Sequence, residues 1–332
     1  MNEATYDLIP AKKAFSRTGW AMSAILALAA LLQVLWFGIS LGVFGEEHWL
    51  NSSSWGMWLG TFLPMYLVAF PTGFLILRKL PAHKPQDQNL SGKQFLMFVP
   101  MSLCLMYVGN LIGNTIALSL SGGSAENAVV SYAMDNNPLK ILVMVIVAPI
   151  LEEYLCRKQI IDRTRQYGEK TAVLLSGLVF ALMHQNLFQF FYAFGLGILF
   201  AYIYVRTGRL RYPVILHCIV NFLGSVVAPW VLSGVDLAAL ESLDPTASPE
   251  AMGELIGQNL PGFLGYLLYA MLLMGFAAWG LILLILKAGK TVWKESDLQL
   301  PKGSAFKAVF LNGGMVVYIV LCVGTIILSL FA

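Results

Sequence analysis

Long apolar segments dominate this chain, and they restrict the folds that are open to it. Nine such segments can be delimited, at about residues 21–45, 55–77, 95–120, 138–156, 171–187, 188–205, 212–233, 262–286 and 308–331. Charged residues make up only 12% of the 332 residues, whereas a soluble domain carries about 25%. A membrane-spanning helix needs about 20 apolar residues, and a barrel strand needs about 10 of alternating character. The sequence therefore predicts an all-α polytopic membrane protein with about nine transmembrane helices.

Basic residues alternate from loop to loop, which predicts the orientation of the chain. If the N-terminus is cytoplasmic, 20 of the 21 Lys and Arg residues fall in cytoplasmic segments, and Lys140 is the exception. The loops on the other side are acidic, as at Glu46 and Glu47 and in 234–260. Cytoplasmic loops of membrane proteins carry an excess of Lys and Arg. We therefore expect a multi-pass protein of the plasma membrane with its N-terminus inside and its C-terminus outside.

Two polar stretches, 80–93 and 234–260, divide the apolar segments into three groups. The first group is expected to be a cytoplasmic tail with two helices, the second a core, and the third an outer acidic loop with two helices. The corresponding boundaries are 1–92, 93–233 and 234–332. No internal repeat is evident, which weighs against a secondary transporter because many transporters have repeated halves.

Two adjacent carboxylates, Glu152 and Glu153, stand near the end of the segment 138–156, and Arg157 follows. Charged side chains at membrane depth are costly and usually mark function. On a helix, Glu153 and Arg157 are four residues apart in the favourable order for an ion pair. Glu152 points about 100° away and has no such intrahelical partner. Glu152 is therefore the candidate general base, and Glu153 and Arg157 are interpreted as supporting structure.

Three further polar side chains are expected at the depth of Glu152. Gly168 lies 16 residues from both Glu152 and His184, so a hairpin that turns at Gly168 brings these two side chains to one level. His217 and Asn221 are four residues apart. His217 comes six residues after Arg211, so it lies roughly 9 Å below the membrane interface if Arg211 marks that interface. A single His or Asn in a membrane helix is more often a hydrogen-bonded structural residue. Four polar groups at one depth predict a shared site instead.

These residues resemble the motifs of the CPBP intramembrane protease family, also called the ABI or type II CAAX prenyl endopeptidase-like family. The family motifs EExxxR, FxxxH and HxxxN correspond in order to residues 152–157, 180–184 and 217–221. The resemblance covers about 138–232, under a third of the chain. It implies hydrolysis of a peptide bond near the cytoplasmic face. The expected partners are membrane lipid and a peptide or membrane-protein substrate, without nucleic acid.

The family pattern also implies a role for each motif residue. Glu152 would activate water with help from His184. His217 and Asn221 would stabilise the oxyanion of the tetrahedral intermediate. Phe180 would pack the site. The substrate class stays open, because relatives of this kind either remove the tripeptide after a prenylated cysteine or serve bacteriocin processing and self-immunity.

Metal dependence also stays open at the level of the sequence. Glu152, His184 and His217 could supply three zinc ligands with one open position. No HExxH motif is present, and the three residues come from separate helices. The implied roles need no metal, so we expect no tightly bound ion, with a divalent metal such as zinc as the alternative.

Other functions are compatible with parts of this pattern. In a proton-coupled transporter, Glu152, His184 and His217 would form a proton relay. A catalytically silent protein of bacteriocin self-immunity or membrane binding would keep the fold without the reaction. A Cys–His protease would use Cys156 or Cys218, but neighbouring helical residues such as His217 and Cys218 point about 100° apart. The complete motif set favours the endopeptidase.

Overall fold

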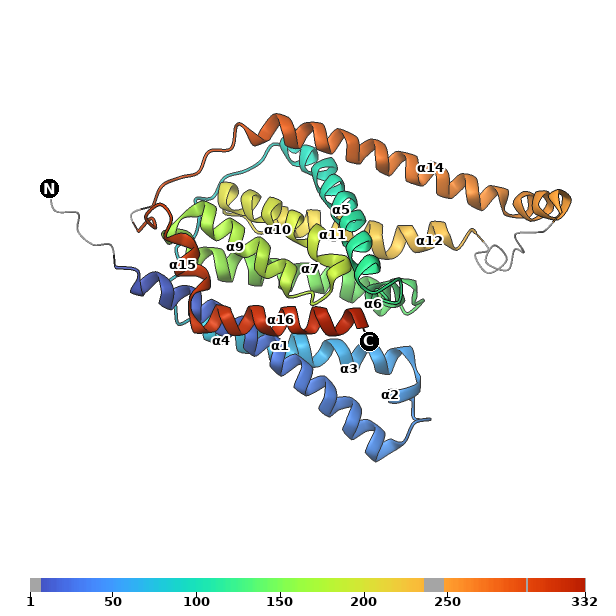
Figure 1. The fold of residues 1–332 in the computed structure, drawn as a ribbon, viewed down its shortest axis with the longest axis horizontal. Helices are drawn as coiled ribbons and strands as arrows, with labels where there is room; N and C mark the ends of the chain where they lie inside the picture. Colours follow the sequence, from blue (N-terminus) through green and yellow to red (C-terminus); the bar gives the residue numbers. More distant parts are fainter. Residues whose placement is uncertain (1–6, 236–247, 297, 332) are drawn as a thin grey trace.

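The computed structural model describes residues 7–235, 248–296 and 298–331 of the chain. In this part of the chain all regular secondary structure is helical (Figure 1). The predicted all-α class is therefore confirmed. Part of the predicted outer loop 234–260, including Asp236, Glu241 and Asp244, lies outside the described residues.

The helices follow one another along the whole described chain. The N-terminal part contains α1 (Ile9–Phe44), α2 (Trp49–Ser52), α3 (Ser54–Pro64), the π-helical segment η1 (Met65–Ala69) and α4 (Phe70–Leu77). The central part contains α5 (Gly92–Leu120), α6 (Ala128–Met134), the π-helical segment η2 (Ile141–Val147), α7 (Ala148–Glu153), the π-helical segment η3 (Tyr154–Ile161), α8 (Asp162–Thr164), the 3₁₀ turn η4 (Arg165–Tyr167), α9 (Glu169–Leu182), α10 (Leu187–Thr207), α11 (Arg211–Phe222), the π-helical segment η5 (Leu223–Val227) and α12 (Ala228–Leu232). The C-terminal part contains α14 (Pro249–Ala288), α15 (Ala305–Phe310) and α16 (Gly313–Phe331).

Seven helices of the described chain are long and apolar enough to cross a membrane. They are Ile9–Phe44, Ser54–Leu77, Gly92–Leu120, Leu187–Thr207, Arg211–Leu232, Asn259–Ala288 and Gly313–Phe331. Large apolar side chains such as Leu67, Ile285 and Leu328 stay exposed on their outer faces, as expected for a surface that meets lipid. The protein is thus a multi-pass membrane protein.

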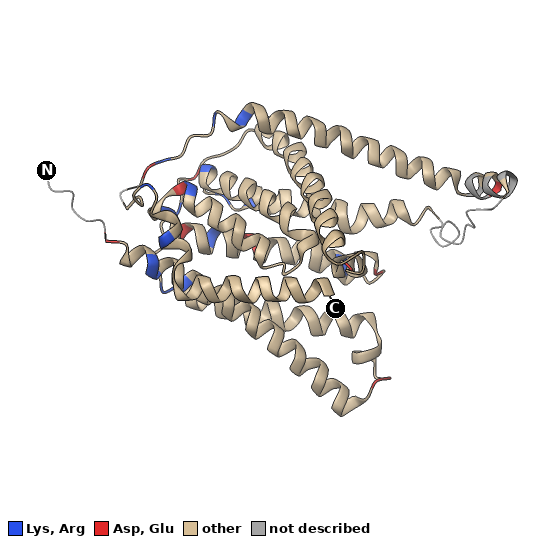
Figure 2. Cartoon of the chain, in the orientation of Figure 1, with Lys and Arg blue, Asp and Glu red and all other residues tan. Residues whose placement is uncertain are grey.

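The other two predicted segments, 138–156 and 171–187, are helical but are not among these seven. The first carries Lys140 and the paired glutamates, and the second contains α9, which has only 14 residues. The count of nine spans stays a prediction. So does the orientation, although Lys and Arg gather at one end of the helix bundle (Figure 2).

The hairpin predicted at Gly168 is present. Residues 141–164 form a nearly continuous helix in which π and α geometry alternate, and η4 then leads into Gly168. Gly168 has φ of 133°, a conformation that L side chains rarely adopt, and α9 begins at the next residue. The hairpin lays α9 beside η3, so the glutamates and His184 come from neighbouring helices.

The core is built around α9 and α10. Helix α10 packs against both α9 and α5, and the contact with α5 is close because Gly109 faces Tyr192. A Cβ atom on Gly109 would lie 2.4 Å from the Tyr192 backbone. Helix α16 packs on α1 and reaches α9, where Tyr318 donates a buried hydrogen bond of 2.9 Å to the carbonyl of Val179. Helix α14 lies on the outside, along α5 (Figure 1).

Candidate active site

Glu152 and Glu153 lie where the helix changes from α to π geometry. They are the last two residues of α7, and η3 begins at the next residue. Short π segments within helices are frequent at functional sites. The Glu153 side chain is fully buried, whereas the Glu152 side chain is 14% exposed and lines a cavity. The different environments predicted for the two carboxylates are therefore present in the structure.

Glu153 and Arg157 form the predicted ion pair at the base of the site. Arg157 Nε and Nη2 donate to the two carboxylate oxygens of Glu153 at 2.8 and 3.1 Å, and both side chains are completely buried. Arg157 Nη1 donates to Ser176 Oγ at 2.9 Å, and Ser176 in turn donates to the carbonyl of Cys156 at 2.8 Å. Buried charges need both a partner and hydrogen bonds. This network supplies both.

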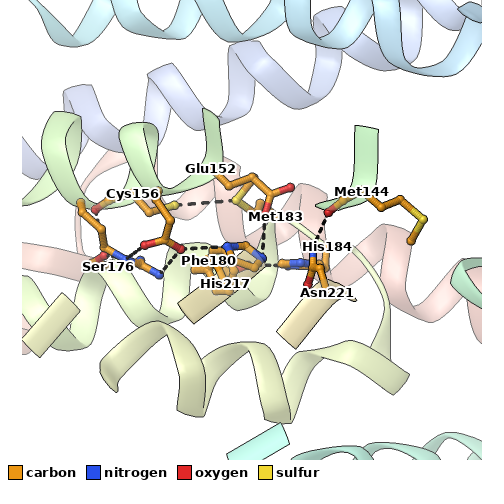
Figure 3. A network of polar contacts seen from close by, with 11 residues as sticks. Met144, Glu152, Cys156, Ser176, Phe180, Met183, His184, His217 and Asn221 are labelled. Atoms are coloured by element: carbon orange, nitrogen blue, oxygen red, sulfur yellow. Dashed lines mark hydrogen bonds and ion pairs between the residues drawn. The ribbon is translucent and has the colours of Figure 1, made fainter. Parts of the chain in front are cut away.

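His217 lies between the two glutamates. Its Nδ1 is 3.1 Å from Glu153 Oε1, and its Nε2 is 3.8 Å from Glu152 Oε2 (Figure 3). A carboxylate paired with Arg157 can only accept, so His217 donates through Nδ1. This hydrogen bond orients the ring and turns Nε2 toward Glu152. Glu153 thus has a second contact that helical spacing alone does not reveal.

His184 and Phe180 form the third side of the site. His184 Nδ1 is 2.7 Å from the carbonyl oxygen of Phe180, which can only accept, so Nδ1 carries a proton and Nε2 of the neutral ring keeps its lone pair. The Phe180 ring lies 5.0 Å from the His184 ring and 5.5 Å from the His217 ring, between centroids. The guanidinium carbon of Arg157 lies 4.9 Å from the centre of the Phe180 ring. Phe180 therefore packs against both imidazoles and the ion pair.

Asn221 fastens α11 to the helical segment that precedes the glutamates. Its Nδ2 donates to the carbonyl of Met144 in η2 at 2.8 Å (Figure 3). That bond uses one of the two amide N–H groups, and the second is left for a ligand in the adjoining cavity. Ser225 Oγ donates to the Asn221 carbonyl at 2.6 Å and lies on the same cavity.

A cavity of about 460 Å³ joins these side chains. One wall carries Glu152, His184, His217 and Asn221. Another part of the lining comes from α3, η1, α6 and α10 and is mostly apolar and aromatic, with Phe62, Met65, Tyr66, Val129, Tyr132, Tyr192 and Leu196. All four side chains predicted to be catalytic thus lie on one cavity, which has a polar side and an apolar side.

Two side chains at the site were missed from the sequence, Ser176 and Tyr192. The spacing of Ser176 could have indicated its place at the site, because it precedes Phe180 by four residues and His184 by eight and so shares their helix face. No feature of the sequence distinguishes Tyr192 from a residue that only packs between helices. Its hydroxyl accepts a hydrogen bond of 2.7 Å from Gln189 Nε2, and both side chains line the cavity.

The three candidate zinc ligands line one cavity without forming a ligand set. Within the described ranges, no three His, Cys, Asp or Glu side chains are close enough together to hold a metal ion. Glu152 Oε2 and His217 Nε2 approach to 3.8 Å, and His184 does not complete a set of three with them. In this arrangement the residues do not fit a resident zinc, which needs ligands about 2.0–2.2 Å from the ion.

None of the four cysteines, all of which the structure describes, lines this cavity. Cys104, Cys156 and Cys322 are buried free thiols, and Cys218 is half-buried. Cys156 Sγ lies 3.8 Å from the sulfur of Met183 and so faces another apolar side chain. The Cys–His protease interpretation therefore has no geometric support.

Comparisons with known proteins point to the same part of the chain. Residues 135–223 match the family model described as type II CAAX prenyl endopeptidase Rce1-like. The membrane-embedded CAAX protease MroQ of Staphylococcus aureus is 28% identical over 172 residues, which are 48% of this chain and 69% of that protein. The putative membrane peptidase YdiL of Bacillus subtilis is 26% identical over 207 residues, which are 60% of this chain and 80% of that protein. No solved structure gives a significant match.

The matched segment contains all three motifs and every side chain of the polar wall. Both relatives carry names that denote a membrane protease or peptidase, and this supports the same class of enzyme for the chain. Residues 135–223 of the chain are thus similar to the type II CAAX prenyl endopeptidase Rce1-like family, and the resemblance inferred from the motifs is confirmed.

Proposed function

We propose that the chain is an intramembrane endopeptidase in which Glu152 activates the attacking water. The observation that carries this proposal is the convergence of Glu152, His184, His217 and Asn221 on one cavity of about 460 Å³. The apolar part of the cavity lining suits a peptide segment that enters from the membrane. The family match supports the reaction class, and the geometry supports the division of roles.

Glu152 is the carboxylate that the ion pair leaves free for proton transfer. Glu153 is occupied by Arg157 and His217, whereas Glu152 faces the cavity. A water molecule between Glu152 and His184 donates one hydrogen bond to the carboxylate and one to His184 Nε2. As the water oxygen attacks the peptide carbonyl carbon, Glu152 takes the proton. It then passes the proton to the leaving amine nitrogen when the C–N bond breaks.

His217 and Asn221 are the proposed donors to the oxyanion. Asn221 has one amide N–H that its bond to Met144 leaves unused. His217 is held by Glu153 through Nδ1, which directs Nε2 into the cavity, where Nε2 can donate once both ring nitrogens carry protons. Donors that are already oriented before the charge develops stabilise the transition state without reorganisation. The glutamate that pairs with Arg157 thus also positions the histidine.

We also propose that the reaction needs no bound metal, because each step above is assigned to a side chain. The expected result is that purified protein treated with a chelator and dialysed keeps its rate of peptide cleavage. Metal analysis of the same sample is expected to show no stoichiometric zinc. A zinc-dependent protease treated in parallel must lose its activity. Activity that disappears on chelation and returns with zinc would refute a metal-free mechanism.

The proposed substrate is a membrane-tethered peptide or membrane protein, cleaved near the basic end of the helix bundle. The name of MroQ states that this relative is a CAAX protease. Peptides with and without a prenylated cysteine therefore form the natural first substrate pair. Product masses from wild-type protein would identify the cleaved bond.

His184→Ala is the test of the second proposed proton acceptor. We expect cleavage of a vesicle-reconstituted peptide to fall by about 100-fold or more, the range expected for loss of a group that assists proton transfer. His83→Ala is the matched control, because His83 is an exposed loop residue whose backbone makes its hydrogen bonds. Equal rates for His184→Ala and wild type would exclude His184 from the mechanism.

A further inference from the structure

A second cavity, of about 550 Å³, lies between α5, α10 and α14. Helix α14 packs along α5 and crosses it where Gly280 meets the carbonyl of Pro100. Apolar side chains form most of the walls, among them Met97, Phe98, Leu105, Ile198, Leu199 and Leu284. The cavity, called the α14 groove below, shares no lining residue with the cavity of Glu152. It is therefore separate from the proposed peptide site.

One end of the α14 groove is basic and aromatic. Lys287, Lys290 and Arg206 line this end, and no Asp or Glu is among the described residues that line the groove. Tyr202 and Trp293 pack edge to face there, with ring centroids 5.8 Å apart. Tyr and Trp favour the interface between membrane and water. This end of the groove lies at the end of the bundle where Lys and Arg gather (Figure 2).

The charge at this end is only partly compensated within the protein. Arg206 pairs with Glu169 and lies over the Tyr202 ring at 5.7 Å. Lys287 and Lys290 have exposed side chains, and neither has an acidic partner in the described part of the chain. Two unpaired ammonium groups above an apolar groove are complementary to a molecule with an anionic head and an apolar tail.

The length of the α14 groove matches one leaflet of a bilayer. Its lining runs from Gln94 to Leu105 on α5 and from Arg206 back to Gly195 on α10. Each stretch rises about 16 Å along its helix. Half of a hydrocarbon core of about 30 Å is about 15 Å. An acyl chain whose headgroup lies at the basic end would therefore fill the groove to the middle of the membrane.

We propose that the α14 groove binds one anionic glycerophospholipid. Its phosphate lies between Lys287 and Lys290, and one acyl chain runs between α10 and α14. This gives α14 a role outside the protease core, since without it the groove would have no third wall. Basic pockets between transmembrane helices commonly hold anionic headgroups. The proposal does not depend on the proposed protease function.

The test is a titration of the full-length protein in detergent with dioleoylphosphatidylglycerol, followed by native mass spectrometry. We expect one tightly bound lipid, with dioleoylphosphatidylcholine binding more weakly. Lys287→Gln with Lys290→Gln should weaken the first binding event by about 10- to 30-fold, because each substitution removes the attraction of one ammonium group for the anionic headgroup. The matched control is Lys302→Gln with Lys307→Gln, which removes two exposed charges of the same C-terminal region outside the groove. This control should bind like wild type.

A steric variant tests the headgroup end of the site. Ala288 is exposed and lines the groove next to Lys287, so Ala288→Trp should block this end and abolish the tight event without unfolding the protein. If that variant does not fold, the lysine pair still decides the question. Equal binding of the two phospholipids, or equal weakening in both lysine pairs, would overturn the proposal. Displacement of the phospholipid by a farnesylated peptide would also overturn it, since the occupant would then be an isoprenoid.

Discussion

Glu152→Gln is expected to abolish peptide cleavage and to leave the protein folded. The amide keeps the shape of the side chain but cannot take a proton from water. General-base catalysis contributes about 10²–10⁴-fold, so the remaining rate should be at most about 1% of wild type. Glu152 makes no direct hydrogen bond within the described structure, and His217 Nε2 lies 3.8 Å from its Oε2. Its loss should therefore have little effect on folding.

The measurement is the initial rate of cleavage of a membrane-tethered peptide in reconstituted vesicles. Size-exclusion profiles and thermal midpoints should match between wild type and Glu152→Gln. Glu46→Gln makes the same chemical change in an exposed loop and should retain full activity. Glu152→Asp keeps a carboxylate but withdraws it by one methylene, so an intermediate rate is expected. A fully active Glu152→Gln enzyme would rule out Glu152 as the base.

Glu153→Gln is expected to reduce both stability and activity. Glu153 accepts hydrogen bonds from Arg157 and His217 at a position with no exposed area. Its neutralisation leaves the Arg157 charge buried without a partner, which costs about 3–5 kcal/mol in comparable buried pairs. His217 also loses the carboxylate that orients its ring, so the proposed oxyanion donor is misplaced. Thermal unfolding and the cleavage rate should both show the loss.

A double variant separates the two roles of Glu153. In Glu153→Gln with Arg157→Met, both charges are removed, and replacing a buried pair by neutral or apolar groups is often tolerated. We expect the thermal midpoint to recover in large part while cleavage stays low, because His217 still lacks its carboxylate. Asp87→Asn is the control, since it breaks the exposed ion pair with Lys84 and should change neither property. Recovery of activity in the double variant would show that Glu153 serves the ion pair alone.

The fold class and much of the site could be predicted because both depend on local regularities. Apolar length identifies helices that cross a membrane, and seven of the predicted segments have such helices in the described structure. The ion pair of Glu153 and Arg157 follows from the i, i+4 geometry of one helix. The hairpin turns at Gly168, where φ is 133°, a conformation that glycine adopts readily and other residues rarely do.

Contacts between helices could not be predicted in the same way. In a membrane, lipid and a neighbouring helix are both apolar, so the apolar pattern of a helix does not predict which face packs against protein. The rotation of each helix about its axis therefore cannot be read from the sequence. The contact between His217 and Glu153, the bond from Asn221 to Met144 and the place of Tyr192 on the cavity all depend on that rotation. So does the gap between α10 and α14 that forms the α14 groove.

By itself the sequence determined the all-helical membrane class and the polar side chains that stand among the apolar segments, because charge and apolar length are properties of each segment alone. It also separated Glu152 from Glu153, since only Glu153 has a partner one turn away. The tertiary structure alone decided that His217 reaches both glutamates, and it gave the shared site predicted for four polar side chains its cavity and its apolar lining. Close packing of helices sets these relations, and it depends on side-chain shapes distant in the chain rather than on local spacing.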